Sequence, residues 1–456
     1  MQAQRLLSCC VQQAWSSGLT YGQRRGGRSA LMLRMGPSRR SAARLLMAAL
    51  CLPLATPAVV ATVAAAGAVP FRRGIGITHT LAWADVEGGP ESRFRFPPFS
   101  GPDRAMTAVE IRNLREAGLD FVRLGVDPGP FLQFTGRQRD WMDRTLSDSV
   151  KRFLDADLGV IVDIHPSDLA PDYVADRLTE GVRAPRFRAY LELVAQMAER
   201  LAALRSDRVA LELFNEPSQA PEVWQPMLEA AYAAARKRAP RLPLVLGGGG
   251  QNGLDGLLKM DLRPFLQDPA VIYTFHDYEP YQYTHQGAAE HAAADLVDVP
   301  YPASVRPLSD TLAASRRAIA ASDRTPAQRA EAEAEATRHI DHYARFGFDR
   351  AALSRSFDDI ADWARRHGIA PGRILLGEFG ARLTPFSGGA VQRAERRRYL
   401  RDMREVAEAH GFAWSVFAYR GLGGFALARN ETGPDLDPLV TDALGLRMPG
   451  EQRKTR

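Results

Sequence analysis

From about residue 70 onward, short apolar runs alternate with longer segments in which apolar residues recur at helical spacing. The runs are rich in Val, Ile, Leu and Phe and do not alternate with polar residues, which is typical of parallel strands buried on both faces. The pattern predicts eight such strands, at Gly74–Thr80, Phe121–Val126, Gly159–His165, Val209–Phe214, Leu242–Gly247, Val271–Phe275, Arg373–Gly377 and Phe412–Phe417.

The segments between these runs predict amphipathic helices. They are Ala108–Glu116, Trp141–Ala156, Phe187–Leu204, Glu222–Arg238, Phe357–His367 and Arg393–Ala409. Eight strands with intervening helices indicate an α/β protein of the (β/α)₈ TIM-barrel type. A doubly wound open sheet is the alternative. It is less favoured because no glycine-rich phosphate fingerprint follows the first strand.

The spacing is uneven after the sixth strand. Roughly a hundred residues separate Phe275 from Arg373, far more than one crossover helix uses. We expect Tyr281–Arg350 to form an extended loop insertion at the C-terminal mouth of the barrel, where barrel enzymes vary their substrates. Within it, Thr325–Tyr343 is helical in pattern and reads as a solvated decoration. The aromatic segment Tyr278–Tyr283 is the better candidate for touching substrate.

Charge excludes one class of partner. The 456 residues are 45% hydrophobic and carry a formal net charge of +6. Residues 1–68 hold eight arginines and no acidic residue, so the rest of the chain has a net charge of −2. A nucleic-acid-binding domain needs clustered basic charge on its folded surface. We therefore expect no nucleic-acid partner.

Residues 1–68 predict an export leader. The pair Arg39-Arg40 precedes the apolar run Leu45–Val63, and small residues follow as far as Ala68. These are the three parts of a secretory signal, although a start at Met35 would be more economical. We expect cleavage and an exported protein, periplasmic or secreted. The alternative is an uncleaved membrane anchor, against which Pro57 and the many alanines argue, so no stable membrane insertion is expected.

All three cysteines, Cys9, Cys10 and Cys51, fall inside this leader. The exported chain would therefore have no disulfide, no cysteine nucleophile and no cysteine ligand for zinc. Residues 69–447 are expected to form a single catalytic barrel, and 448–456 a short polar tail. We expect a monomer.

Two glutamates follow predicted strands in similar ways. Glu216 comes after Val209–Phe214 in Asn-Glu-Pro, and Glu378 comes after Arg373–Gly377 in Gly-Glu-Phe-Gly. In a barrel the C-terminal ends of the strands form one face, across which strands four and seven oppose each other. Glycosidic bond cleavage requires two facing carboxylates, one to protonate the leaving oxygen and one to act at the anomeric carbon. Carboxyl groups about 5 Å apart predict retention of configuration, and about 6.5–9.5 Å predicts inversion.

Several strings, in this order and spacing, resemble glycoside hydrolase family 5, the cellulase-like retaining glycosidases with catalytic glutamates on strands four and seven. The resemblance covers nearly all of residues 69–447. It rests on Phe121-Val122-Arg123-Leu124, Val162-Asp163-Ile164-His165, Asn215-Glu216-Pro217, Phe275-His276-Asp277-Tyr278 and Gly377-Glu378-Phe379-Gly380. Thr284–Ala288 and the glycine run Gly247–Gly250 resemble a bacterial branch of the same family.

The resemblance implies that Glu216 is the catalytic acid/base and Glu378 the nucleophile. Arg123, always charged and fork-shaped, is the natural group to keep Glu378 ionised. Tyr278 could donate a hydrogen bond to the same carboxylate. Asn215 could bind the sugar 2-hydroxyl, a contact that strengthens in the transition state.

His165 and His276 would line the sugar subsite next to the cleaved bond. Asp163 has the same strand parity as His165, so it should point inward as a buried structural acid. No metal and no cofactor are expected. A metal site of His165, His276 and a carboxylate is the alternative.

The sequence departs from the family at the end of strand eight, where a tryptophan usually stacks under the sugar. Trp414 is taken as the substrate-binding residue there, with Phe417 as the alternative and Trp414 then in the core. A phenyl ring gives a smaller stacking platform than an indole. Trp83 and Trp224 are further stacking candidates.

Taken together, these residues predict a retaining hydrolase of a β-linked polysaccharide, foremost an endo-β-1,4-glucanase. Within the same class, the alternatives are a β-mannanase and a hydrolase or transglycosylase that processes an exopolysaccharide. Outside it, the alternative is a non-catalytic barrel that binds polysaccharide.

Overall fold

The computed structural model describes residues 71–88, 92–289, 291–383, 390–421, 423–429 and 434–448. The predicted leader lies outside these ranges, and so does the predicted polar tail apart from Met448. Within the described residues, no helix is both long and apolar enough to cross a bilayer.

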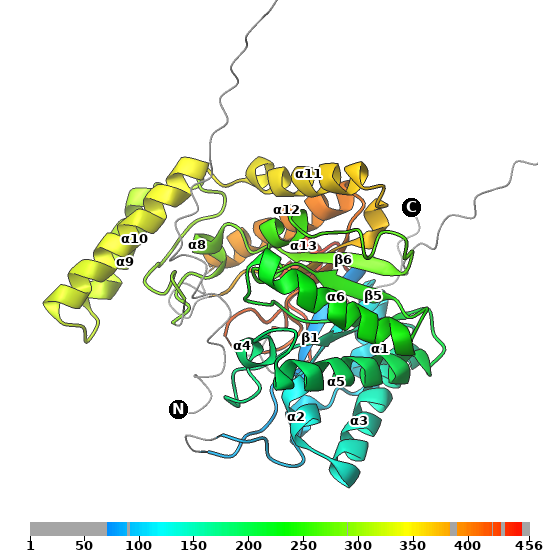
Figure 1. Ribbon diagram of the computed structural model, residues 1–456. Helices are drawn as coiled ribbons and strands as arrows, with labels where there is room; N and C mark the ends of the chain where they lie inside the picture. The colour runs from blue at the N-terminus through cyan, green and yellow to red at the C-terminus, as the bar shows by residue number, and fades with distance from the viewer. Residues whose placement is uncertain are drawn as a thin grey trace, which may run out of the picture.

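Eight parallel strands pair in chain order and close into a barrel, which confirms the predicted (β/α)₈ fold (Figure 1). Pairing of Gly74 with Ser415 joins the first strand to the last. The strands are β1 (Arg73–Leu81), β2 (Phe121–Val126), β3 (Gly159–Ile164), β4 (Val209–Glu212), β5 (Leu244–Gly247), β6 (Val271–His276), β7 (Ile374–Glu378) and β8 (Ala413–Val416).

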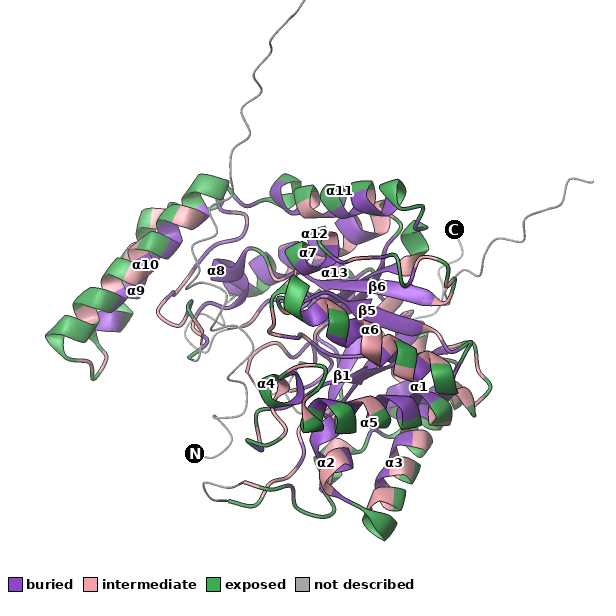
Figure 2. Ribbon diagram, in the orientation of Figure 1, coloured by how far each residue is buried: buried purple, intermediate pink, exposed green. Residues whose placement is uncertain are grey.

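Helices surround the barrel and cover the outward faces of the strands (Figure 1). Figure 2 shows that β5 and β6 are buried along their length, while outer helices such as α5 and α11 are buried on one side and exposed on the other. The α-helices are α1 (Ala108–Ala117), α2 (Pro128–Gln133), α3 (Gly136–Asp155), α4 (Ala175–Leu178), α5 (Pro185–Ala202), α6 (Pro221–Arg238), α7 (Leu254–Leu258), α8 (Tyr281–Thr284), α9 (Leu308–Ala320), α10 (Pro326–Phe346), α11 (Arg350–Arg366), α12 (Ala390–Ala409) and α13 (Pro438–Ala443). Short 3₁₀ turns lie at η2 (Pro102–Arg104) and η3 (Pro371–Arg373).

The insertion after β6 is more helical than its sequence indicated. α9 and α10 pack on each other as a hairpin that projects away from the barrel (Figure 1). Thr325 begins α10 with a capping box shared with Gln328, in which each side chain accepts from the other residue's backbone N–H. α9 was not predicted, since it was included in the loop. α10 was expected to be a solvated decoration, but it is also attached to the segment that precedes the hairpin. The hydroxyl of Tyr343 on α10 donates a hydrogen bond to the backbone carbonyl of Pro300.

The barrel interior is built in layers from alternate residues of each strand. The lowest layer is an apolar cluster of Phe71, Phe121, Ile161, Ala210, Val245, Ile272, Leu375 and Ala413. Two residues further along β2, β3 and β4, the same parity places Arg123, Asp163 and Glu212 inside the barrel. The packed floor therefore supports a charged layer, which lies toward the C-terminal ends of the strands.

Asp127 ties the loops after β2 and β3 together. It is fully buried, accepts from the backbone N–H of Gly129 as the N-cap of α2, and accepts from the hydroxyl of Ser167 at 2.5 Å. Burial is the largest influence and raises the pKa of Asp127 to about 7, against the hydrogen bonds from Ser167 and Gly129 and the charge of His165, with Asp168 adding to the increase.

This raised pKa predicts a pH-dependent stability. The folded state holds a proton on Asp127 that the unfolded chain releases, so the contribution is complete below pH 3.8 and is lost as pH rises through about 7. Between pH 5 and pH 8 the wild type should lose about 3 kcal/mol more of its free energy of unfolding than Asp127→Asn. Urea titrations of both proteins at the two pH values measure this. Equal losses in the two proteins would contradict the prediction.

Candidate active site

Arg123 lies at the centre of the charged layer and contacts every carboxylate in it. Its Nε and Nη2 donate to the two oxygens of Glu212 at 2.7 and 2.8 Å. Nη2 also donates to Oδ1 of Asn215 at 2.8 Å and lies 3.2 Å from Asp163 Oδ2. Nη1 donates to Oε1 of Glu378 at 2.6 Å. The guanidinium is therefore fixed in orientation by a bidentate pair on one edge and points its other edge at Glu378.

The buried charges of this layer shift one another's pKa values. Burial alone would lower the pKa of Arg123, but Asp163, Glu212 and Glu378 raise it well above its ordinary value. Burial would raise the pKa of Asp163, yet Arg123 and His165 outweigh burial and lower it. For Glu212 burial prevails, and its pKa rises to about 7 despite Arg123. Asp163 is thus the inward-pointing buried acid that strand parity predicted, and Arg123 is a partner of its carboxylate.

Glu378 is the last residue of β7 and is 5% exposed. Both of its oxygens have donors, since Oε2 accepts from the hydroxyl of Tyr278 at 2.8 Å and Oε1 from Arg123. A fixed cation and a phenol together stabilise a charged carboxylate at this place. The residue before Glu378 is Gly377, and the packing there leaves no room for a side chain. A Cβ on Gly377 would lie 2.4 Å from Oγ1 of Thr274 inside the barrel.

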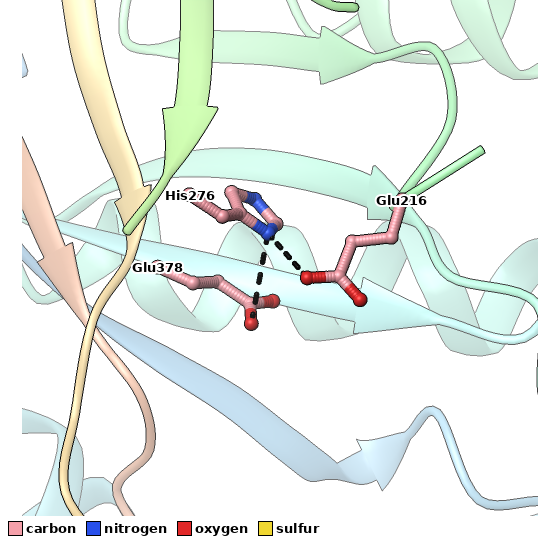
Figure 3. Close-up of side chains that lie close together, drawn as sticks. All are labelled: Glu216, His276 and Glu378. Carbon is pink, nitrogen blue, oxygen red and sulfur yellow. Dashed lines mark hydrogen bonds and ion pairs between the residues drawn. The ribbon is translucent and has the colours of Figure 1, made fainter. Parts of the chain in front are cut away.

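Glu216 lies four residues beyond the end of β4, in the loop that leads to α6. Its backbone has φ 48°, the left-handed region that residues other than glycine seldom adopt. Its Oε1 is 2.7 Å from Nδ1 of His276, and this same nitrogen is 3.8 Å from Oε2 of Glu378 (Figure 3). The side chain of Glu216 is 14% exposed and that of Glu378 is 6% exposed.

The two glutamates therefore meet across the barrel mouth. One carboxylate oxygen of Glu216, one of Glu378 and a ring nitrogen of His276 all lie within 4.8 Å of one another. Figure 3 shows both carboxylates directed toward the same side of the imidazole.

The pKa values of the two histidines beside these carboxylates shift in opposite directions. Burial, the largest influence, lowers the pKa of His276 to about 4, so its imidazole is neutral near pH 7. For His165 burial acts in the same direction, but Asp163, whose Oδ2 is 2.7 Å from Nδ1, outweighs burial and raises the pKa. Nε2 of His165 lies 3.4 Å from the amide nitrogen of Asn215. The structure thus places five of the predicted residues around the glutamate pair: Arg123, His165, Asn215, His276 and Tyr278.

Glu216, His276 and Glu378 also have the donor atoms that a divalent metal could use. The sequence had suggested a metal site that also included His165. The structure leaves His165 out of the set, because its Nδ1 is directed at Asp163. Arg123 donates to Glu378 at 2.6 Å and would place a positive charge beside any bound cation. The donor set fits a metal, but the electrostatics oppose one.

The prediction for Trp414 is wrong. Ala413 points into the barrel, so its neighbour Trp414 points outward, where it is 0% exposed, packs edge-to-face on Phe379 and donates its indole N–H to Glu408 of α12. Phe417 directly follows β8 and has the same strand parity as the inward-pointing Ala413. It is half-buried and lies nearer the mouth of the barrel than Trp414.

Trp224 is likewise a core residue, 1% exposed, and its indole N–H donates to the carbonyl of Gly247. Trp83 does reach the site, since its half-buried ring lies 5.8 Å from that of His165.

Sequence reasoning did not identify Glu212 or Phe425. Glu212 could have been found, since it is a charged residue at inward parity within an otherwise apolar strand. Phe425 gave no signal, because it lies in the loop after β8 and reaches the site only through folding. Its ring is 5.9 Å from Tyr278 and 6.0 Å from Phe417.

Comparisons with known proteins identify the family of this chain. The family model described as Cellulase (glycosyl hydrolase family 5) matches residues 85–421. Endoglucanase C of Acetivibrio thermocellus is 27% identical over 209 residues, which cover 44% of this chain and 59% of that protein. The matched part thus spans less than two thirds of that relative's length.

Two solved structures share the fold. The cellulose synthase subunit Z of Clostridioides difficile has a TM-score of 0.55 and 21% identity, covering 82% of this chain and 99% of its own. Thermotoga maritima Cel5A with cellobiose has a TM-score of 0.56 and 18% identity, covering 82% and 97%, and the same protein has been solved with mannotriose. Because its model match covers most of the sequence, the chain belongs to the cellulase family, glycosyl hydrolase family 5.

Proposed function

We propose that this protein cleaves a β-linked glucan with retention of anomeric configuration, through a covalent glycosyl-enzyme intermediate. The observation that carries the proposal is the approach of a Glu216 oxygen and a Glu378 oxygen to within 4.8 Å. Retaining glycosidases hold their carboxyl groups about 5–5.5 Å apart, whereas inverting enzymes leave room for a water between them. The separation favours direct attack by one of the two carboxylates.

In the first step, Glu216 as a carboxylic acid protonates the glycosidic oxygen while an oxygen of Glu378 bonds to the anomeric carbon and the leaving sugar departs. In the second step, Glu216 as a carboxylate takes a proton from water, and the water oxygen displaces Glu378. Arg123 and Tyr278 hold Glu378 for attack. Neutral His276 places no positive charge beside Glu216, which must carry a proton when the bond breaks.

The remaining residues are assigned to sugar binding. Oδ1 of Asn215 is occupied by Arg123, which leaves its amide N–H groups to serve the sugar 2-hydroxyl and His165. Phe417, in place of the usual tryptophan, offers a smaller platform, with Phe425 against its edge. Trp83 extends the aromatic lining on the side of His165.

A β-1,4-glucan is the proposed substrate, because the sequence relatives carry endoglucanase names. β-Mannan is an alternative substrate, because the Thermotoga protein has been solved with mannotriose. An exopolysaccharide is a second alternative, because one structural neighbour is a cellulose synthase subunit; the same carboxylates would then catalyse hydrolysis or transglycosylation. Paired glutamates with ordered donors argue against a barrel that only binds polysaccharide. Export through the predicted leader remains part of the proposal.

The decisive experiment digests cellulose derivatives, mixed-linkage glucan, mannan, xylan and exopolysaccharide, sizes the products, and follows the first anomer released by proton NMR. Retention predicts that the β-anomer appears first. Release of the α-anomer first would contradict the double displacement.

Glu378→Ala should lower turnover by about 10⁴-fold or more, because it removes the group that bonds to the anomeric carbon. The circular dichroism spectrum should stay unchanged, since alanine fits the space. Exposed Glu222→Ala on α6 is the control and should keep wild-type activity. Full activity of the Glu378 variant would remove this residue from the mechanism.

Chelation should have no effect on the rate. The protonation and attack are supplied by side chains, and Arg123 opposes a cation beside Glu378. Activity is measured before and after dialysis against EDTA, with metal added back afterwards. A large loss that an added metal restores would contradict this prediction and favour a metal centre at Glu216, His276 and Glu378.

Glu212→Gln should reduce kcat/KM by about 10- to 100-fold, because the guanidinium of Arg123 loses one of the two acceptor oxygens that orient it toward Glu378. The control is Glu222→Gln, which makes the same chemical change at an exposed position of α6. An unchanged rate in the Glu212→Gln variant would show that Arg123 needs no second carboxylate.

A further inference from the structure

The backbone of Glu216 needs support from outside its own loop. A left-handed conformation at a non-glycine residue persists only where the surrounding structure fixes it, and Glu216 has φ 48°. The loop that carries it is short, running from the end of β4 at Glu212 to Pro221 at the start of α6. Its placement therefore depends on the contacts of Pro217–Ala220 with neighbouring segments.

The segment Gly248–Asn252, which directly follows β5, supplies these contacts. Gly250 N–H donates to the carbonyl of Gln219 at 2.7 Å, and Gln251 N–H donates to the carbonyl of Pro217 at 2.8 Å. Both bonds lie on the residues just after Glu216. The loop is thus fastened on its downstream side by two backbone hydrogen bonds.

This contact is close enough to require glycine. A Cβ on Gly249 would lie 2.5 Å from the carbonyl oxygen of Gln219 and 2.9 Å from the Cα of Pro221. A Cβ on Gly248 would lie 2.2 Å from the carbonyl carbon of Gly256 on the other side. These neighbours are backbone atoms that cannot rotate away, so any side chain must push the two segments apart.

The same segment also fixes the partner of Glu216. The carbonyl of Asn252 accepts from the backbone N–H of His276 at 2.8 Å. At its other end, the segment is held through Gly247, whose carbonyl accepts from the indole of Trp224 on α6 at 3.0 Å. One stretch of five residues therefore sets the relative position of Glu216 and His276.

We propose that Gly248–Asn252 is a positioning clamp that holds Glu216 against His276 and so determines how well Glu216 serves as the acid/base. The segment itself touches no reacting atom. The inference rests on the proposed function for its kinetic consequence, but its geometric content, the Glu216–His276 contact, is independent of activity.

The test is Gly249→Ala, with Gly372→Ala as the matched control because a Cβ at Gly372 meets nothing within 4 Å. The kinetic readout is kcat/KM for two aryl β-cellobiosides. A 2,4-dinitrophenyl leaving group departs without protonation, whereas a phenyl leaving group needs the acid. Gly249→Ala should lose about 30- to 100-fold on the phenyl substrate and less than about threefold on the dinitrophenyl substrate.

Trp224→Phe keeps the ring in the core but removes the bond to Gly247, and it should show the same selective loss to a smaller degree. This second variant decides the matter if Gly249→Ala does not fold. Equal losses on both substrates, or none, in a variant with native circular dichroism would overturn the clamp.

A second readout separates the clamp from the proposed function. The chain has nine histidines, so ¹⁵N-histidine labelling resolves the hydrogen-bonded Nδ1 of His276 by NMR. Its signal should shift in Gly249→Ala and stay in place in Gly372→Ala. A wild type without glycosidase activity would end the proposed function and leave this readout to decide the clamp. An unshifted signal would end the clamp alone.

Discussion

The guanidinium of Arg123 is a positive charge buried at the centre of the barrel, and the charged layer depends on it. It is 2% exposed and contacts Glu212, Asp163, Glu378 and the side-chain Oδ1 of Asn215. Carboxylates gathered this closely repel one another unless a cation lies between them, and a buried cation in turn is costly without partners. Loss of Arg123 would therefore leave the carboxylates uncompensated, while the carboxylates together offset the burial of the guanidinium.

Strand parity connects this electrostatic layer to the packing beneath it. Phe121, Ile161 and Ala210 fill the floor, and the residues two positions later on the same strands are Arg123, Asp163 and Glu212. A slip of one residue in any of these strands would turn a charge outward and an apolar side chain inward. The hydrophobic core thus specifies the register that places the charges, and the register places Arg123 opposite the end of β7.

Much of the fold and of the candidate site could be predicted, because both depend on local pattern. The buried strands are continuous apolar runs, and Arg123, His165, His276 and Glu378 lie in or at the ends of these strands. The prediction for Trp414 failed because the choice between it and Phe417 depends on which residues of β8 face inward, and this short strand is buried on both faces. Phe425 and the backbone contacts of Gly249 arise between loops, where no periodicity exists to be read.

The different surroundings of the two glutamates decide their proposed roles. Glu378 accepts from a fixed cation and from a phenol, both of which favour a permanent negative charge. Glu216 is more exposed and has beside it an imidazole that burial keeps neutral, a partner that can share a proton but adds no charge. Two carboxylates in unlike environments can hold different protonation states at one pH. A nucleophile and an acid/base require this, and reversing the roles would place the proton on the carboxylate that Arg123 already neutralises.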